Sequence, residues 1–196
     1  MFWPRTTPVL YRFDMWNIPR VSLLAVATAL LLSGCAPGDS GATRDPTPSS
    51  TPIFATEEEA LAAATAAYAA YVRVSDQILM DGGADPDRIK QVAGPVVAKE
   101  ETRGYKKFVE LHFRTIGATT FDSAKLQSFS PTSTNGKSVV TSYLCVDASK
   151  VDVLNEQNDS VVSPERPDRV GFEVHFDTKS SDSRTLIVSS KEVWTQ

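Results

Sequence analysis

The sequence has few residues with metal-binding or redox chemistry: two cysteines and two histidines in a chain of 196 residues. His112 and His175 have no third ligand near them at the spacing of a zinc site. Cys35 and Cys145 are too few to form a disulfide framework. We therefore expect neither a bound metal ion nor a cofactor.

The chain also lacks an excess of positive charge, because 20 Lys and Arg against 24 Asp and Glu give a formal net charge of −4 at pH 7. No basic stripe stands out along the sequence, so the electrostatic footprint of nucleic-acid binding is missing. The Gly-x-Ser-x-Gly, His-Glu-x-x-His and Ser-x-x-Lys motifs of hydrolytic enzymes do not occur. We predict no nucleic-acid partner and no catalytic residue, and a non-enzymatic protein is favoured over an enzyme.

The apolar run from Val21 to Leu32 is shorter than the roughly 20 residues that a membrane-spanning helix needs. Arg12 and Arg20 precede this run, and the small residues Ser33 and Gly34 follow it. A basic leader, a short apolar core and small residues before a cleavage point indicate a secretory signal peptide.

The segment Leu32-Ser33-Gly34-Cys35 resembles the lipobox of bacterial lipoproteins. The resemblance implies that the Cys35 sulfur receives a diacylglyceryl group and that cleavage before Cys35 removes residues 1–34 as a signal peptide. Two or three acyl chains hold a protein stably at about 0.8 kcal/mol per buried CH₂. The expected location is the outer face of the cell membrane. If the source has two membranes, Ala36 in place of Asp after the cysteine favours the outer membrane.

The mature chain is predicted to consist of a tether and one head domain. Residues 35–55 begin with the lipidated cysteine and are rich in Pro, Ser and Thr, with almost no large apolar residue before Ile53, which predicts disorder. About 20 flexible residues span on the order of 25 Å. Residues 56–196 are long enough for a single domain with its own core.

The first half of the head is predicted to be helical. Thr56-Glu57-Glu58-Glu59 has the form of a capping box, and the helix that it begins should end at Asp81-Gly82-Gly83. Asp85-Pro86 predicts a cap and the start of a short second helix. A third helix is expected from about Pro95 to Ile116, with Gly117 as its stop.

After Gly117 the apolar period changes from about 3.6 to 2, which predicts strands. Asn135-Gly136 is a hairpin turn signal, and the alternation of residues 169–177 is typical of a half-buried antiparallel strand. The other strands are predicted at Phe121–Phe129, Val139–Val146, Val151–Leu154 and Arg184–Trp194. Helices before an antiparallel sheet indicate the α+β class, with the helices packed on one face of a curved sheet.

This order of elements, with the paired Tyr68 and Tyr71 on the long first helix, resembles the nuclear-transport-factor-like cone, a superfamily that includes ketosteroid isomerase. A cystatin-like wrap with one helix fewer is the alternative. The resemblance implies an apolar pocket between sheet and helices. Aromatic residues that would line this pocket, or pack as ordinary core, are Tyr68, Tyr71, Phe108, Tyr143, Phe172 and Trp194. A pocket carboxylate is needed in isomerase-type members, and Asp147 and Glu173 are candidates that no motif assigns.

Three other groups of residues are expected to be structural. Cys145 lies in an apolar strand and is predicted to be a buried, unreactive thiol. His112 and His175 are predicted to be packed or surface side chains. An acidic cluster is expected to end and cap helices rather than to bind calcium, and consists of Asp81, Asp85 and Asp87.

Two functions remain open from the sequence. The first is a membrane-tethered, non-enzymatic head that binds an envelope protein or other cell-envelope component, or serves as an accessory subunit. The second is a carrier of a small apolar ligand, or an isomerase-like enzyme, that uses the pocket between sheet and helices.

Overall fold

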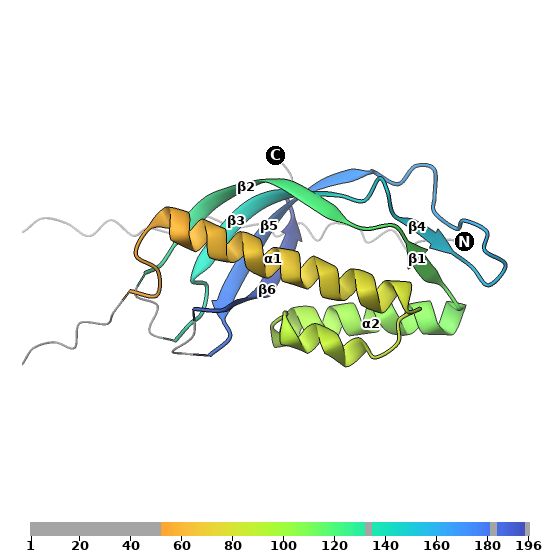
Figure 1. Cartoon of the computed structure of the whole chain (residues 1–196), viewed down its shortest axis with the longest axis horizontal. Helices are drawn as coiled ribbons and strands as arrows, with labels where there is room; N and C mark the ends of the chain where they lie inside the picture. The colour runs from red at the N-terminus through yellow and green to blue at the C-terminus, as the bar shows by residue number, and fades with distance from the viewer. Residues whose placement is uncertain (1–51, 132–134, 181–183, 195–196) are drawn as a thin grey trace, which may run out of the picture. The chain divides into compact units, whose positions relative to one another are not determined.

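The computed structural model describes residues 52–131, 135–180 and 184–194 (Figure 1). The predicted signal peptide, Cys35 and most of the predicted tether lie outside these residues. The helices of the described residues are α1 (Glu57–Met80), the 3₁₀ helix η1 (Pro86–Gln91) and α2 (Pro95–Leu111). The strands are β1 (Arg114–Ile116), β2 (Thr120–Phe129), β3 (Val140–Asp147), β4 (Asp152–Leu154), β5 (Arg169–Thr178) and β6 (Leu186–Val193).

The predicted capping box begins α1. Thr56 Oγ1 accepts a hydrogen bond from the Glu59 backbone N–H at 3.2 Å, and Glu59 Oε2 accepts one from the Ala55 N–H at 2.8 Å. These side chains satisfy donors that a helix start leaves without partners. The helix ends where predicted, because Gly82 and Gly83 have φ values of 69° and 86°, in the left-handed region.

The end of the predicted tether differs from the expectation of disorder. Phe54 is buried and its ring lies 6.1 Å from that of Phe129 on β2. The Ile53 N–H donates to the Pro131 carbonyl at 3.0 Å. Two apolar side chains in a row give this stretch enough buried surface to offset its ordering, so the head includes residues before Thr56.

The third helix is shorter than predicted. It ends at Leu111, because His112 adopts a left-handed conformation with φ 52° and the Phe113 N–H donates to the Phe108 carbonyl at 2.9 Å. The residues that follow form β1, which pairs with β4 in an antiparallel two-stranded ribbon. Gly117 is therefore a turn residue after a strand (φ 82°) and not a helix stop.

A second correction concerns Asp85, the predicted cap of the second helix. It has φ 46° and its side chain makes no capping hydrogen bond. Arg88 instead stabilises this turn by donating to Asp81 Oδ2 at 2.7 Å and to the Ala84 carbonyl at 3.0 Å.

The four long strands form one antiparallel sheet in the order β2-β3-β5-β6. β3 and β5 pair without a register shift, from Val140 opposite Phe176 to Asp147 opposite Arg169. The Asn135-Gly136 turn lies within a longer connection between β2 and β3, because Phe129 already pairs with Val140.

The helices pack on one face of the sheet, as predicted, and the sheet curves around α1 without closing into a barrel (Figure 1). Val174, Phe176 and Val188 have no exposed surface and face α1 and α2. The α+β class is confirmed. In the described ranges, no helix is both long and apolar enough to cross a membrane.

Alanine substitutions at two glycines, Gly83 and Gly104, are predicted to change the stability of the protein in opposite directions. At Gly83, with φ 86°, a Cβ atom would lie 2.3 Å from the Tyr105 carbonyl oxygen, so Gly83→Ala should lower the free energy of unfolding by at least about 1–2 kcal/mol. At Gly104, within α2, nothing lies within 4 Å, and Gly104→Ala should raise it by about 0.5–1 kcal/mol. Urea unfolding of the two variants checks this. A Gly83→Ala protein as stable as the wild type would contradict the turn geometry.

Candidate functional site

Aromatic side chains fill the centre of the space between helices and sheet, where a cone-type pocket is predicted. Tyr68 is 2% exposed and its ring meets that of Phe121 edge-on, with centroids 5.0 Å apart. Tyr71 packs 5.6 Å from Tyr68, and Tyr105 of α2 is equally buried. These residues belong to the continuous hydrophobic core, which was the alternative to a pocket lining.

The other predicted lining residues do not converge on this space. Phe108 packs against Phe113, with ring centroids 6.1 Å apart. Tyr143 stacks on Trp194 at 5.1 Å, and both lie on the sheet face opposite the helices, because Leu144 beside Tyr143 points into the core. Only Phe172 joins Tyr68 and Tyr71 at the helix-covered face.

A polar cluster of Tyr71, Glu101 and Lys191 joins α1, α2 and β6. The Tyr71 hydroxyl donates a short hydrogen bond to Glu101 Oε1. Lys191 Nζ donates to the Tyr71 hydroxyl at 2.9 Å and lies 3.3 Å from Glu101 Oε1. It also lies 5.1 Å from the centroid of the Tyr71 ring and 5.4 Å from that of Phe172, in cation–π geometry.

Burial, followed by the negative charge of Glu101, raises the pKa of Tyr71 far above its ordinary value. The same two causes raise the pKa of Tyr68 and of Tyr105. The Tyr105 hydroxyl donates to Ser75 Oγ at 2.9 Å. Tyr71 and Tyr105 are neutral hydrogen-bond donors that join α1 to α2, so their hydroxyls do not supply a base or a nucleophile.

The two candidate carboxylates lie on the sheet face opposite the helices. Asp147 accepts from Arg169 Nη1 at 2.8 Å. Hydrogen bonds from the Ser149 hydroxyl and N–H, and then from Arg169, lower the pKa of Asp147 to about 2. Glu173 pairs across the strands with Tyr143, so it also points away from the helices. Neither candidate carboxylate therefore faces the space between sheet and helices.

The structure brings His175 and Glu173 together but keeps the histidines apart. His175 Nε2 lies 2.9 Å from Glu173 Oε1, and its Nδ1 lies 3.1 Å from the Thr141 hydroxyl. Thr141 is itself buried, so its hydroxyl is not open to a substrate. His112 lies near Glu156, at 3.5 Å, after the end of α2. His112 is thus a surface side chain and His175 a partly buried side chain packed on the sheet, as expected from the sequence.

The remaining candidates have structural surroundings too. Asp81 pairs with Arg88, and Asp87 pairs with Lys90, each at 2.7 Å. No group of three or more His, Cys, Asp or Glu side chains that could hold a metal ion occurs among the described residues. Cys145 is free and only partly buried, so its predicted full burial is wrong. It lies opposite Gly171, on the same sheet face as Tyr143.

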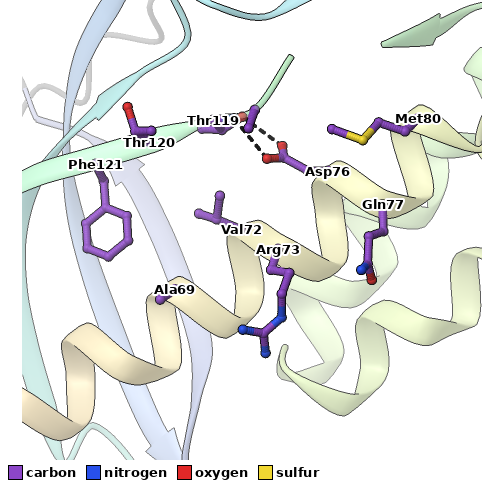
Figure 2. A pocket seen from close by; sticks show the side chains of 10 residues that line it. Ala69, Val72, Arg73, Asp76, Gln77, Met80, Thr119, Thr120 and Phe121 are labelled. Carbon is purple, nitrogen blue, oxygen red and sulfur yellow. Dashed lines mark hydrogen bonds between the residues drawn. The ribbon is translucent and has the colours of Figure 1, made fainter. Parts of the chain in front are cut away.

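One surface groove, of about 440 Å³, runs between α1 and the start of β2 (Figure 2). Asp76 in this groove accepts from the Thr119 N–H at 2.9 Å and from the Thr119 hydroxyl at 2.8 Å. Figure 2 shows Val72 and Phe121 as its apolar wall. Both Asp76 oxygens are engaged in anchoring the β1–β2 connection, which leaves them a positioning role.

A larger groove, of about 890 Å³, lies between α2, η1 and β6. Its basic side chains are Lys90, Lys99, Arg103, Lys106 and Lys179. Its single acidic side chain is Asp87, which pairs with Lys90. We call this the basic groove. Lys99, Arg103, Lys106 and Lys179 make no ion pair with any described residue.

The basic groove corrects the prediction that no basic stripe exists. The net negative charge of the chain gave no indication of a local basic surface. The basic side chains also come from separate parts of the sequence: the 3₁₀ helix η1, α2 and the residue after β5. Only part of it was visible in the sequence. Lys99, Arg103 and Lys106 follow the spacing i, i+4, i+7, which places them on one face of a helix.

Comparison with known proteins adds no relative. No family model matches the chain, and no curated protein matches its sequence. Among solved structures, the chain is similar to a de novo designed β-sheet protein solved by solution NMR, with 10% identity and a TM-score of 0.26. That match covers 70% of this chain and 85% of the designed one. A TM-score this low supports no statement about fold or function.

The buried tyrosines predict a specific response to alkaline pH. An unfolded chain releases phenol protons near pH 10, whereas the folded chain retains those of Tyr68, Tyr71 and Tyr105. The free energy of unfolding should therefore fall as the pH rises above about 10. Tyrosinate absorbance and circular dichroism, followed together, check this. Tyr143 lies outside the core, so the contradicting result is tyrosinate formation near pH 10 by Tyr68, Tyr71 or Tyr105 in a fully folded protein, beyond the signal that a Tyr143→Phe variant removes.

Proposed function

We propose that this protein is a lipid-anchored lipoprotein on the outer face of the cell membrane, whose head binds an envelope component through its surface. The claim that the head binds through its surface rests on the filled space between helices and sheet. Tyr71, Glu101 and Lys191 occupy the place of the pocket that a carrier or an isomerase-like enzyme would use. A ligand must then meet the head at its outside.

The lipobox at Leu32–Cys35 supports the anchor, and the tether supports a head that moves close to the membrane surface. In a source with two membranes, the proposed location is the outer membrane. The basic groove is the largest of the grooves described above, and its charge is opposite to that of the chain as a whole. These features support a binding or accessory role rather than catalysis.

We also propose that the head has the nuclear-transport-factor-like cone as its fold type. Three helices before the strands, and a sheet that curves around the first of them, support the cone over the cystatin-like wrap, which has one helix fewer. The fold type does not bring a ligand pocket with it here, because the core side chains of α1 fill that space.

The anchor is tested by Cys35→Ser. Without the thiol, no diacylglyceryl group can be attached, so the head should leave the membrane fraction or accumulate as an uncleaved precursor. Fractionation of cells followed by intact mass spectrometry checks this, with Cys145→Ser as the matched control. A mature-sized Cys35→Ser protein that stays in the membrane fraction would show that the lipobox interpretation is wrong.

Surface binding is tested by photocrosslinking on intact cells. A photoreactive residue at Arg103, in the basic groove, should give adducts that the same probe at Lys107, on α2 but outside the groove, does not give. A probe at Gln77 reports on the groove beside α1. Equal labelling from all three positions would count against a dedicated binding surface.

A further inference from the structure

The basic groove concentrates positive charge in a molecule that is otherwise acidic. Five basic side chains and one acidic side chain line it, a formal charge of +5 − 1 = +4. Cleavage before Cys35 would remove three arginines and one aspartate, so the chain charge would move from −4 to −4 − 3 + 1 = −6. The rest of the mature chain then carries −6 − 4 = −10. This separation favours the approach of an anion through the basic groove.

The floor of the groove adds two further preferences. Its apolar lining residues, which we call the apolar floor, are Ala93, Pro95, Ala98 and Ile187. Thr102 also lines the groove, and its hydroxyl oxygen is buried without a hydrogen-bond partner among the described residues. A buried hydroxyl without a partner is costly, and rotation of the Thr102 side chain about χ1 would let it donate to a ligand oxygen in the groove. The lining therefore suits a ligand with an anionic group and an adjoining apolar part.

We propose that the basic groove binds the phosphate group of an anionic phospholipid, with the glycerol carbons over the apolar floor. This inference rests on the proposed lipid anchor, which would place the head within a tether length of such lipids. Lys and Arg side chains near an anionic leaflet each add about 1 kcal/mol, roughly a fivefold gain in partition. Tethering adds a high effective concentration, so a groove with modest affinity is occupied.

The test uses the processed, lipidated protein reconstituted in vesicles. One set contains phosphatidylglycerol mixed with phosphatidylcholine, and the other contains phosphatidylcholine alone. Lysines are briefly labelled with an amine-reactive reagent, and each site is quantified by peptide mass spectrometry. Lys99, Lys106 and Lys179 should be labelled at least about fivefold more slowly on the anionic vesicles. Lys107 and Lys125, which do not line the groove, should be labelled at the same rate on both.

Two double variants with the same change in charge separate the groove from general attraction. Lys99→Glu with Arg103→Glu should abolish the slower labelling of Lys106 and Lys179. Lys107→Glu with Lys125→Glu should leave it intact. Circular dichroism checks that both variants keep their fold. If the two variants behave alike, the groove is not the lipid site and the proposal is overturned.

The remaining outcomes distinguish the lipid from other sources of phosphate and the groove from the anchor. Millimolar inorganic phosphate that slows labelling on phosphatidylcholine vesicles as much as phosphatidylglycerol does would overturn the lipid assignment. Equal labelling on both vesicle types by firmly anchored protein would overturn the groove inference alone. A protein that does not remain with either vesicle would contradict the anchor. The groove is then tested by adding anionic vesicles to the free chain, where the same lysines should be protected.

Discussion

The arrangement of the head depends on the contact of Tyr71, Glu101 and Lys191, where α1, α2 and β6 meet. A carboxylate and an ammonium group that are only about one-quarter exposed need each other, because an unpaired charge at such a position is costly. The phenol joins them and is held neutral by its burial. The cluster therefore fixes the rotation of α2 about its own axis relative to the sheet.

That rotation decides which side chains of α2 reach the surface beside β6. Glu101 points inward to Lys191, so Lys99 and Arg103, two residues away on either side, lie on the opposite side of the helix, where they line the basic groove. Thr102 lies between the two faces, and its hydroxyl oxygen is buried at the groove. On β6, Ile187 is the neighbour of the core residue Val188 in the sequence, and its side chain contributes to the groove lining. The interior cluster and the basic groove are thus two sides of one packing arrangement.

Much of the fold was predictable because the signals were local. The capping box at Thr56, the left-handed glycines after α1 and the alternation along β5 each depend on neighbouring residues alone. The end of α2 was not predictable in this way. Phe113 to Ile116 could continue a helix, and the pairing of Arg114–Ile116 with β4, some 40 residues further along, decides the outcome. The burial of Phe54, at the end of the predicted tether, depends on a similar long-range partner, Phe129.

The candidate site, too, was predictable only where its residues are related by local spacing. Helical spacing relates Lys99, Arg103 and Lys106, but Lys90 and Lys179 join them only through tertiary structure. Aromatic residues on a predicted first helix indicate a pocket lining and a core equally well, and what separates the two is whether polar partners from other elements enter the same space. Here Glu101 and Lys191 do so. A solid interior of this kind holds the backbone around the groove in place, so no backbone ordering is needed when the groove binds its ligand. For a head that a lipid anchor would hold near its ligand, such a preformed surface is sufficient, and an enclosed pocket is not required.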